Sequence, residues 1–130
     1  MKTGVLAAGI AAAALFPGTT HGPITVDVTI HHSHFSVAHM AFPRGTTVRF
    51  VIHNTDPIEH EFIVGSAVVQ YYIEHTAHPA HEGSAPGQIT VPAGTTRETT
   101  YRFGRVQPLL FGCHLPGHYA YGMRGTISVT

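Results

Sequence analysis

The chain has 130 residues, a formal net charge of zero at pH 7 and only 11 per cent charged residues. This length suits one domain with a single core. The sparse, balanced charge excludes a basic nucleic-acid-binding protein and a polybasic membrane anchor. A single cysteine cannot form an internal disulfide, so a disulfide scaffold is excluded as well. The unusual feature of the composition is twelve histidines.

The N-terminus has the pattern of an export signal. A short positive start precedes an apolar run from Gly4 to Phe16, which is too short to span a bilayer, and Pro17 then ends any helix. We expect residues 1–20 to be a signal peptide or an N-terminal tail and residues 21–130 to form the domain. The protein would then be secreted or periplasmic, and a retained N-terminal anchor is the alternative.

Strand patterns dominate the rest of the chain. The segments either alternate apolar and polar residues or form short β-branched and aromatic runs. They are Ile24–Ile30, Thr46–Asn54, Phe62–Val64, Val68–Ile73, Ile89–Val91, Thr99–Phe103, Leu109–Cys113 and Thr126–Val129. Residues typical of turns separate them, and we find no helical period of 3.6. The sequence therefore predicts an all-β sandwich of about seven to eight strands.

Two turns share one pattern. The segments 42–47 and 91–96 each contain a proline, one further residue, a glycine and two threonines. Proline fixes φ and glycine permits positive φ, so each segment predicts a tight turn at a strand end. We expect these turns to be equivalent corners of two stacked sheets.

The longest irregular stretch runs from Glu74 to Gly87. It carries His75, His78 and His81 at three-residue spacing, together with prolines and small residues. This composition predicts an exposed, mobile loop.

The single cysteine lies in a motif of metal ligands. Cys113 is followed five residues later by His118, and Met123 follows after another five. His60 begins an apolar run beside the rigid turn at Pro57, so it offers a second imidazole from a different segment. Two imidazoles, a thiolate and a weak axial thioether are the ligands of a blue-copper centre. Because sulfur favours Cu(I) and imidazole also retains Cu(II), one-electron transfer is the first function to consider.

The two segments together resemble the cupredoxin family. The resemblance rests on the HEF segment and on the C-x4-H-x4-M loop with Pro116, Gly117 and Gly122, and it extends from about Ile24 to Thr130. It implies a Greek-key sandwich like that of plastocyanin and azurin, a redox partner protein and a type 1 copper (Cu+/Cu2+). The implied copper ligands are His60, Cys113, His118 and Met123. At His118 we expect an exit for the electron, in a shallow apolar patch.

Glu61 departs from the family pattern. Many cupredoxins have Asn or Ser after the first histidine, and the backbone or side chain of that residue helps to hold the thiolate. Strand alternation places Glu59 and Glu61 opposite His60. We therefore expect both carboxylates to face solvent or a neighbouring histidine rather than to act as acid and base.

His114 is a candidate ligand for a second metal. It directly follows the cysteine, so in a strand its side chain points to the other face. The spacing is similar to that of multicopper oxidases, although those proteins have histidines on both sides of the cysteine and this chain has Gly112 before it. His32 and His34 form the one His-x-His pair, and a symmetric trimer could combine them with His114 between subunits.

Three functions remain open at this point. The first is an electron carrier with one type 1 copper, as a monomer or homotrimer, which would not be an enzyme. The second is an oligomeric copper oxidase or a nitrite reductase that uses His114. The third is a periplasmic or extracellular copper-resistance protein. In that case, histidines of segments 31–34 and 75–81 would load or buffer copper. The chain shows no Ser-His-Asp set, paired catalytic carboxylates or phosphate loop.

Overall fold

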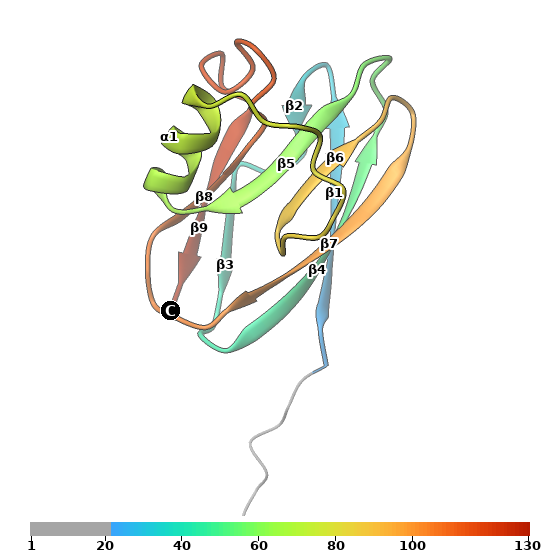
Figure 1. The fold of residues 1–130 in the computed structure, drawn as a ribbon. Coiled ribbons are helices and arrows are strands. Elements are labelled where there is room, and N and C mark those ends of the chain that lie inside the picture. Colours follow the sequence, from blue (N-terminus) through green and yellow to red (C-terminus); the bar gives the residue numbers. More distant parts are fainter. Residues whose placement is uncertain (1–21) are drawn as a thin grey trace, which may run out of the picture.

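The computed structural model describes residues 22–130 as two face-to-face β-sheets and one short helix (Figure 1). Its elements are β1 (Ile24–His31), β2 (His34–Phe35), β3 (His39–Phe42), β4 (Thr46–Asn54), β5 (His60–Gly65), α1 (Ala67–His75), β6 (Gln88–Val91), β7 (Thr96–Phe103), β8 (Leu109–Gly112) and β9 (Arg124–Val129). One sheet has the order β2-β1-β4-β7 and the other β3-β9-β8-β5-β6. The β1–β4 and β3–β9 pairs are parallel. This arrangement confirms the predicted all-β sandwich.

The core lies between the sheets and is rich in phenylalanine. Phe50 of the first sheet meets Phe62 of the second with ring centroids 5.1 Å apart, and Phe62 meets Phe111 at 5.6 Å. All three rings are fully buried. Each such burial contributes about 1.5–3 kcal/mol, so these rings fix the position of β5 and β8, the strands that lead into the candidate site.

The two repeated turns have the same geometry. In the first turn, the amide and hydroxyl of Thr46 donate to the Pro43 carbonyl at 3.1 and 2.6 Å. In the second, Thr95 donates to the Pro92 carbonyl at 3.2 and 2.7 Å. The glycine of each turn has a positive φ, 91° and 65° respectively. Both turns carry the chain from the five-stranded to the four-stranded sheet, as predicted for equivalent corners.

The segment Val68–Ile73, predicted to be a strand, is helical. Its β-branched and aromatic composition suits a strand, but contacts of one face with the sheet override that preference. The Ser66 side chain caps the helix by accepting a hydrogen bond from the Val69 amide at 3.3 Å. Gln70 and Ile73 are buried at helical spacing, whereas the two tyrosines between them are exposed.

Gln70 attaches the helix to the second sheet. Its amide nitrogen donates to the carbonyls of Ile63 at 3.0 Å and Leu110 at 3.2 Å. Its amide oxygen lies 2.5 Å from Nε2 of His114. The side chain therefore joins α1 to β5, β8 and the residue after Cys113.

The predicted signal segment, residues 1–20, lies outside the described part of the chain. Within residues 22–130, no helix has the length and apolar character needed to cross a membrane. The sequence also failed to predict β2 and β3. β2 has two residues, and β3 has four that pair on one side only, with β9. Such short edge strands leave a weak alternation signal.

We predict that Gln70→Leu lowers the free energy of unfolding by about 2–4 kcal/mol, because it keeps the volume but removes three buried contacts. Urea denaturation measures this change. Val68→Ala is the matched control, since Val68 is 77 % exposed on the same helix and should change stability by less than about 0.5 kcal/mol. Equal effects of the two substitutions would show that Gln70 does not attach the helix.

Candidate metal centre

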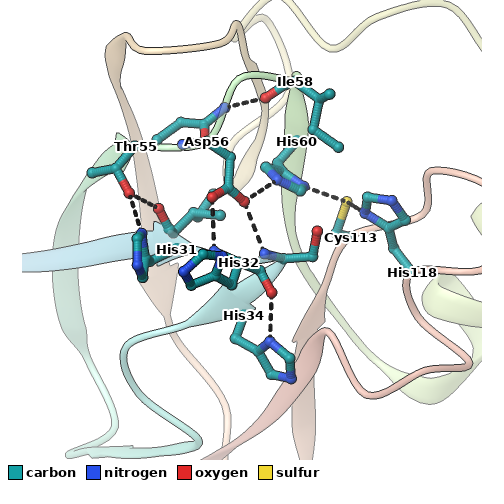
Figure 2. Close-up of polar contacts among 12 residues, drawn as sticks. His31, His32, His34, Thr55, Asp56, Ile58, His60, Cys113 and His118 are labelled. Atoms are coloured by element: carbon teal, nitrogen blue, oxygen red, sulfur yellow. Dashed lines mark hydrogen bonds and ion pairs between the residues drawn. The ribbon is translucent and has the colours of Figure 1, made fainter.

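Three of the predicted ligands converge at the end of the sandwich away from the C-terminus (Figures 1 and 2). His60 begins β5, Cys113 follows β8, and His118 lies in the turn between β8 and β9. Cys113 Sγ is 3.9 Å from Nδ1 of His60 and 3.6 Å from Nδ1 of His118. His60 and Cys113 are fully buried, and His118 is half-buried.

These distances are compatible with one metal ion bound by all three ligand atoms. First-row metal bonds are about 2.3 Å to thiolate and about 2.0 Å to imidazole. In a trigonal site such bonds separate sulfur from nitrogen by about 3.7 Å. The observed 3.6 and 3.9 Å bracket this value. The donor set of one thiolate and two imidazoles suits copper, which these three residues would hold.

Met123 closes the ligand loop from its far end. The Cys113 amide donates to the Met123 carbonyl at 3.1 Å, and the Met123 amide donates to the His118 carbonyl at 3.0 Å. The Met123 side chain is 2 % exposed and belongs to the same buried cluster as Cys113. Its role as an axial ligand stays a prediction.

Asp56 orients His60, a role that the sequence did not reveal. Asp56 Oδ2 lies 2.7 Å from Nε2 of His60, so Nδ1 of that ring faces the cysteine (Figure 2). Backbone amides of His32 and Ser33 also donate to this carboxylate, at 2.7 and 2.8 Å. Burial raises the pKa of Asp56, but the hydrogen bonds from Ser33, His60 and His32 outweigh it and leave the pKa lowered. An ionised carboxylate behind a ligating imidazole fixes its tautomer and direction.

Glu61 supports the cysteine through its backbone. Its amide donates to Cys113 Sγ at 3.3 Å, so this contact does not depend on the side chain that departs from the family pattern. The Glu61 carboxylate is buried and faces His78 and His81, which confirms the expectation of a neighbouring histidine. Most residues of the 74–87 stretch are exposed, as predicted, but His78 and His81 are half-buried, and residues 74–75 belong to α1 rather than to a loop.

At neutral pH, the metal-free site holds a protonated Cys113 thiol and a neutral His118 imidazole. Burial raises the pKa of Cys113 to about 11, although backbone amides of Glu61 and Leu115 favour the thiolate. Burial, and then the neighbouring His60, lower the pKa of His118. A metal that binds the thiolate must therefore displace a proton from Cys113, while His118 is ready to bind at neutral pH.

His114, His32 and His34 do not form a site within one chain. Both ring nitrogens of His114 are engaged, Nδ1 with Glu74 and Nε2 with Gln70, each at 2.5 Å. His32 and His34 lie in the β1–β2 turn and at its exit, and Nδ1 of His34 contacts the His32 carbonyl at 2.7 Å. His34 and His114 line different pockets. A shared site between subunits stays a prediction.

The surface beside His118 is less apolar than predicted. A depression of about 350 Å³ adjoins its ring. Its lining residues are Ser33, His34, Pro116, His118 and Tyr121. Tyr121 is 90 % exposed, and the β1–β2 turn contributes polar groups. The patch is thus mixed in character, because the turn that Asp56 anchors lies beside the ligand loop.

We predict a pH dependence for the stability of the metal-free protein. The folded-state pKa of Cys113 lies above its ordinary value of 9.0, so this thiol stabilises the fold fully below about pH 9. Its contribution is lost as the pH rises towards about 11, at a total cost of roughly 2–3 kcal/mol.

Urea denaturation between about pH 8 and about pH 11 measures this loss. Cys113→Ser is the matched control, because serine keeps the shape but does not titrate in this range. Parallel pH profiles for the two proteins would contradict the prediction.

Comparisons with known proteins agree with this description. No family model matches the chain. It is 36 % identical over 97 residues to the copper-resistant cuproprotein CopI of Rubrivivax gelatinosus, covering 73 % of this chain and 59 % of that protein. It is also 36 % identical over 84 residues to CopI of Vibrio cholerae, covering 63 % and 50 %. The chain thus spans about half to three fifths of these curated relatives.

Solved structures show the same architecture. An auracyanin of Roseiflexus castenholzii matches with a TM-score of 0.69 and 19 % identity, over 84 % of this chain and 99 % of that one. Auracyanin A of Chloroflexus aurantiacus, a blue copper protein, matches with a TM-score of 0.66 and 22 % identity, over 84 % and 100 %. The chain therefore has the cupredoxin fold, as predicted from the ligand motif.

Proposed function

We propose that this protein is a copper-binding electron-transfer protein with one type 1 copper. His60, Cys113 and His118 would hold the ion, and Met123 would be a weaker fourth ligand. The observation that carries the proposal is the convergence of one sulfur and two imidazole nitrogens at distances that fit a trigonal metal. Bound copper would supply one-electron transfer by changing between Cu(I) and Cu(II).

The surrounding residues support this function by keeping the ligands in place. Asp56 fixes the ring of His60, and the Glu61 amide fixes the sulfur of Cys113. Two backbone hydrogen bonds hold the loop that carries the other ligands. A site whose ligands are held in this way needs little rearrangement when the charge of the metal changes. Half-buried His118 would pass the electron to a redox partner protein seated on the neighbouring depression.

A role in copper resistance is the second proposal. It draws support from the relatives, which are named copper-resistant cuproproteins. The predicted export signal would place the protein in the periplasm or outside the cell, where copper enters first. Removing the gene should then lower the copper concentration that cells tolerate, whereas unchanged tolerance would contradict this role.

The oxidase or reductase interpretation has less support. Each ring nitrogen of His114 already contacts a neighbouring side chain, that of Glu74 or of Gln70. A Cβ atom added at Gly112 would lie 2.5 Å from the Tyr119 ring, so the additional histidine of multicopper oxidases would have to displace this ring. We therefore favour an electron carrier over an enzyme.

We predict that the oxidised, copper-loaded protein shows an intense thiolate-to-copper charge-transfer band in its visible spectrum. Cys113→Ser should abolish this band, because an alcohol cannot replace the thiolate. Met40→Leu is a matched sulfur control, since Met40 is buried in β3 and belongs to no ligand motif. The charge-transfer band should remain in the Met40→Leu variant. A wild-type protein that binds copper without any such band would overturn the proposed type 1 site.

We also predict that Asp56→Asn weakens copper binding by about 10–100-fold, because replacing a residue that hydrogen-bonds to a metal ligand commonly has an effect of this size. The amide group would face at least one of the three donors that now point at the carboxylate. Competition with a chelator measures the affinity, and a shifted charge-transfer band would report the changed orientation of His60.

Asp27→Asn is the control for this substitution. Asp27 also contacts a histidine, at 2.8 Å, but this pair is exposed on the first sheet. Its replacement should leave copper affinity unchanged. Equal losses for the two substitutions would exclude a positioning role for Asp56.

A further inference from the structure

A second group of metal-ligand side chains lies on the other face of β5. Glu61 Oε2 is 3.0 Å from Nε2 of His78 and 3.0 Å from Nε2 of His81. One ligand atom from each residue lies within 4.8 Å of the other two. The two imidazole rings are tilted, with centroids 4.9 Å apart. Two imidazole nitrogens therefore lie close to the same carboxylate oxygen.

Hydrogen bonding leaves this group incomplete. Glu61 is 3 % exposed, yet its Oε1 is buried without a hydrogen-bond partner within residues 22–130. Nε2 of His81 is also buried there without one, because its 3.0 Å approach to Oε2 is not aligned for donation. Buried polar atoms are rarely left unpaired, and an unplaced ion is one of the usual reasons. The two unpaired atoms belong to the same three-residue group.

The surroundings give an ion access to this group. Glu61 and His78 line a pocket of about 520 Å³ between α1, the 76–80 segment and the start of the ligand loop. His81 lines the adjoining pocket on the other side of the same segment. His75, the third histidine predicted to act with this loop, is exposed and contacts the Tyr71 carbonyl at 2.7 Å. It takes no part in the group.

We propose that Glu61, His78 and His81 bind a second metal ion. Imidazole and carboxylate ligands suit divalent Cu(II) and Zn(II), and the lack of sulfur disfavours Cu(I). Three protein ligands leave a position open, and the larger pocket supplies space for water or another ligand there. The carboxylate also offsets the charge of the ion. This site goes beyond the proposed electron-transfer copper and differs from it in ligands and preferred oxidation state.

The two sites share one peptide unit. His60 faces the cysteine, while the next residue, Glu61, sends its carboxylate to the opposite face and its amide to Cys113 Sγ. An ion bound by the Glu61 carboxylate would therefore lie next to the peptide unit whose amide donates to Cys113 Sγ. The alternative is that the histidines only pair with the carboxylate, and in that case no ion binds.

Zinc binding to the copper-loaded, reduced protein tests the proposal. Cu(I) fills the first site, and equilibrium dialysis against Zn(II) with metal analysis then counts zinc per chain. The wild type and the control His39→Ala, which removes an exposed imidazole from β3, should each bind one zinc. Three variants should lose at least about tenfold in zinc affinity: His78→Ala, His81→Ala and Glu61→Gln. Replacing a residue that only hydrogen-bonds to a metal ligand already costs about 10–100-fold in affinity, so removing a ligand should cost at least as much.

The outcomes separate the two sites. No zinc on the wild type, or the same affinity in all variants, overturns the proposal. The same measurement on metal-free Cys113→Ser keeps the test independent of the first site. If zinc disappears there but persists in His81→Ala, the ion belongs to the cysteine site and the proposal fails. Circular dichroism checks that each variant folds. If Glu61→Gln does not fold, the two alanine variants are sufficient for the test.

Discussion

The hydrogen bond from the Glu61 amide to the Cys113 sulfur is the contact on which the site depends. It joins the start of β5 to the end of β8, two neighbouring strands of the second sheet. Because side chains alternate along a strand, the side chains of His60 and Glu61 lie on opposite faces of β5. His60 lies with the cysteine and His118, and the Glu61 carboxylate lies with His78 and His81. One backbone position therefore orients both groups of side chains.

Two buried groups of the cysteine site, Asp56 and Cys113, differ in how well hydrogen-bond donors support their charge. Asp56 accepts three hydrogen bonds, and so it stays ionised despite its burial. Cys113 has weaker support, and its thiol stays protonated until a metal replaces the proton. The carboxylate provides the fixed negative charge beside His60, and the sulfur becomes charged only when a cation compensates it.

The sequence was informative where the local pattern also determines the structure. Alternation located most strands, and the spacing from Cys113 to His118 indicated a ligand loop. It was less informative where distant contacts decide the result. Residues 67–75 have strand-like composition, but Gln70 meets the carbonyls of two strands and the segment becomes a helix. The roles of Asp56 and of the Glu61 carboxylate also depend on segments far away in the chain. An acidic residue four positions before His60 was the one local hint.

The close contact between Gly112 and Tyr119 limits how this protein can evolve. Tyr119 stacks on His114 with ring centroids 4.7 Å apart, and the Arg124 guanidinium lies 5.1 Å from the centre of its ring. A side chain at position 112 would have to displace this whole stack. A histidine before the cysteine would therefore first have to push the Tyr119 ring away from His114, next to Cys113. The fold thus favours glycine at position 112, even in a chain so rich in histidine.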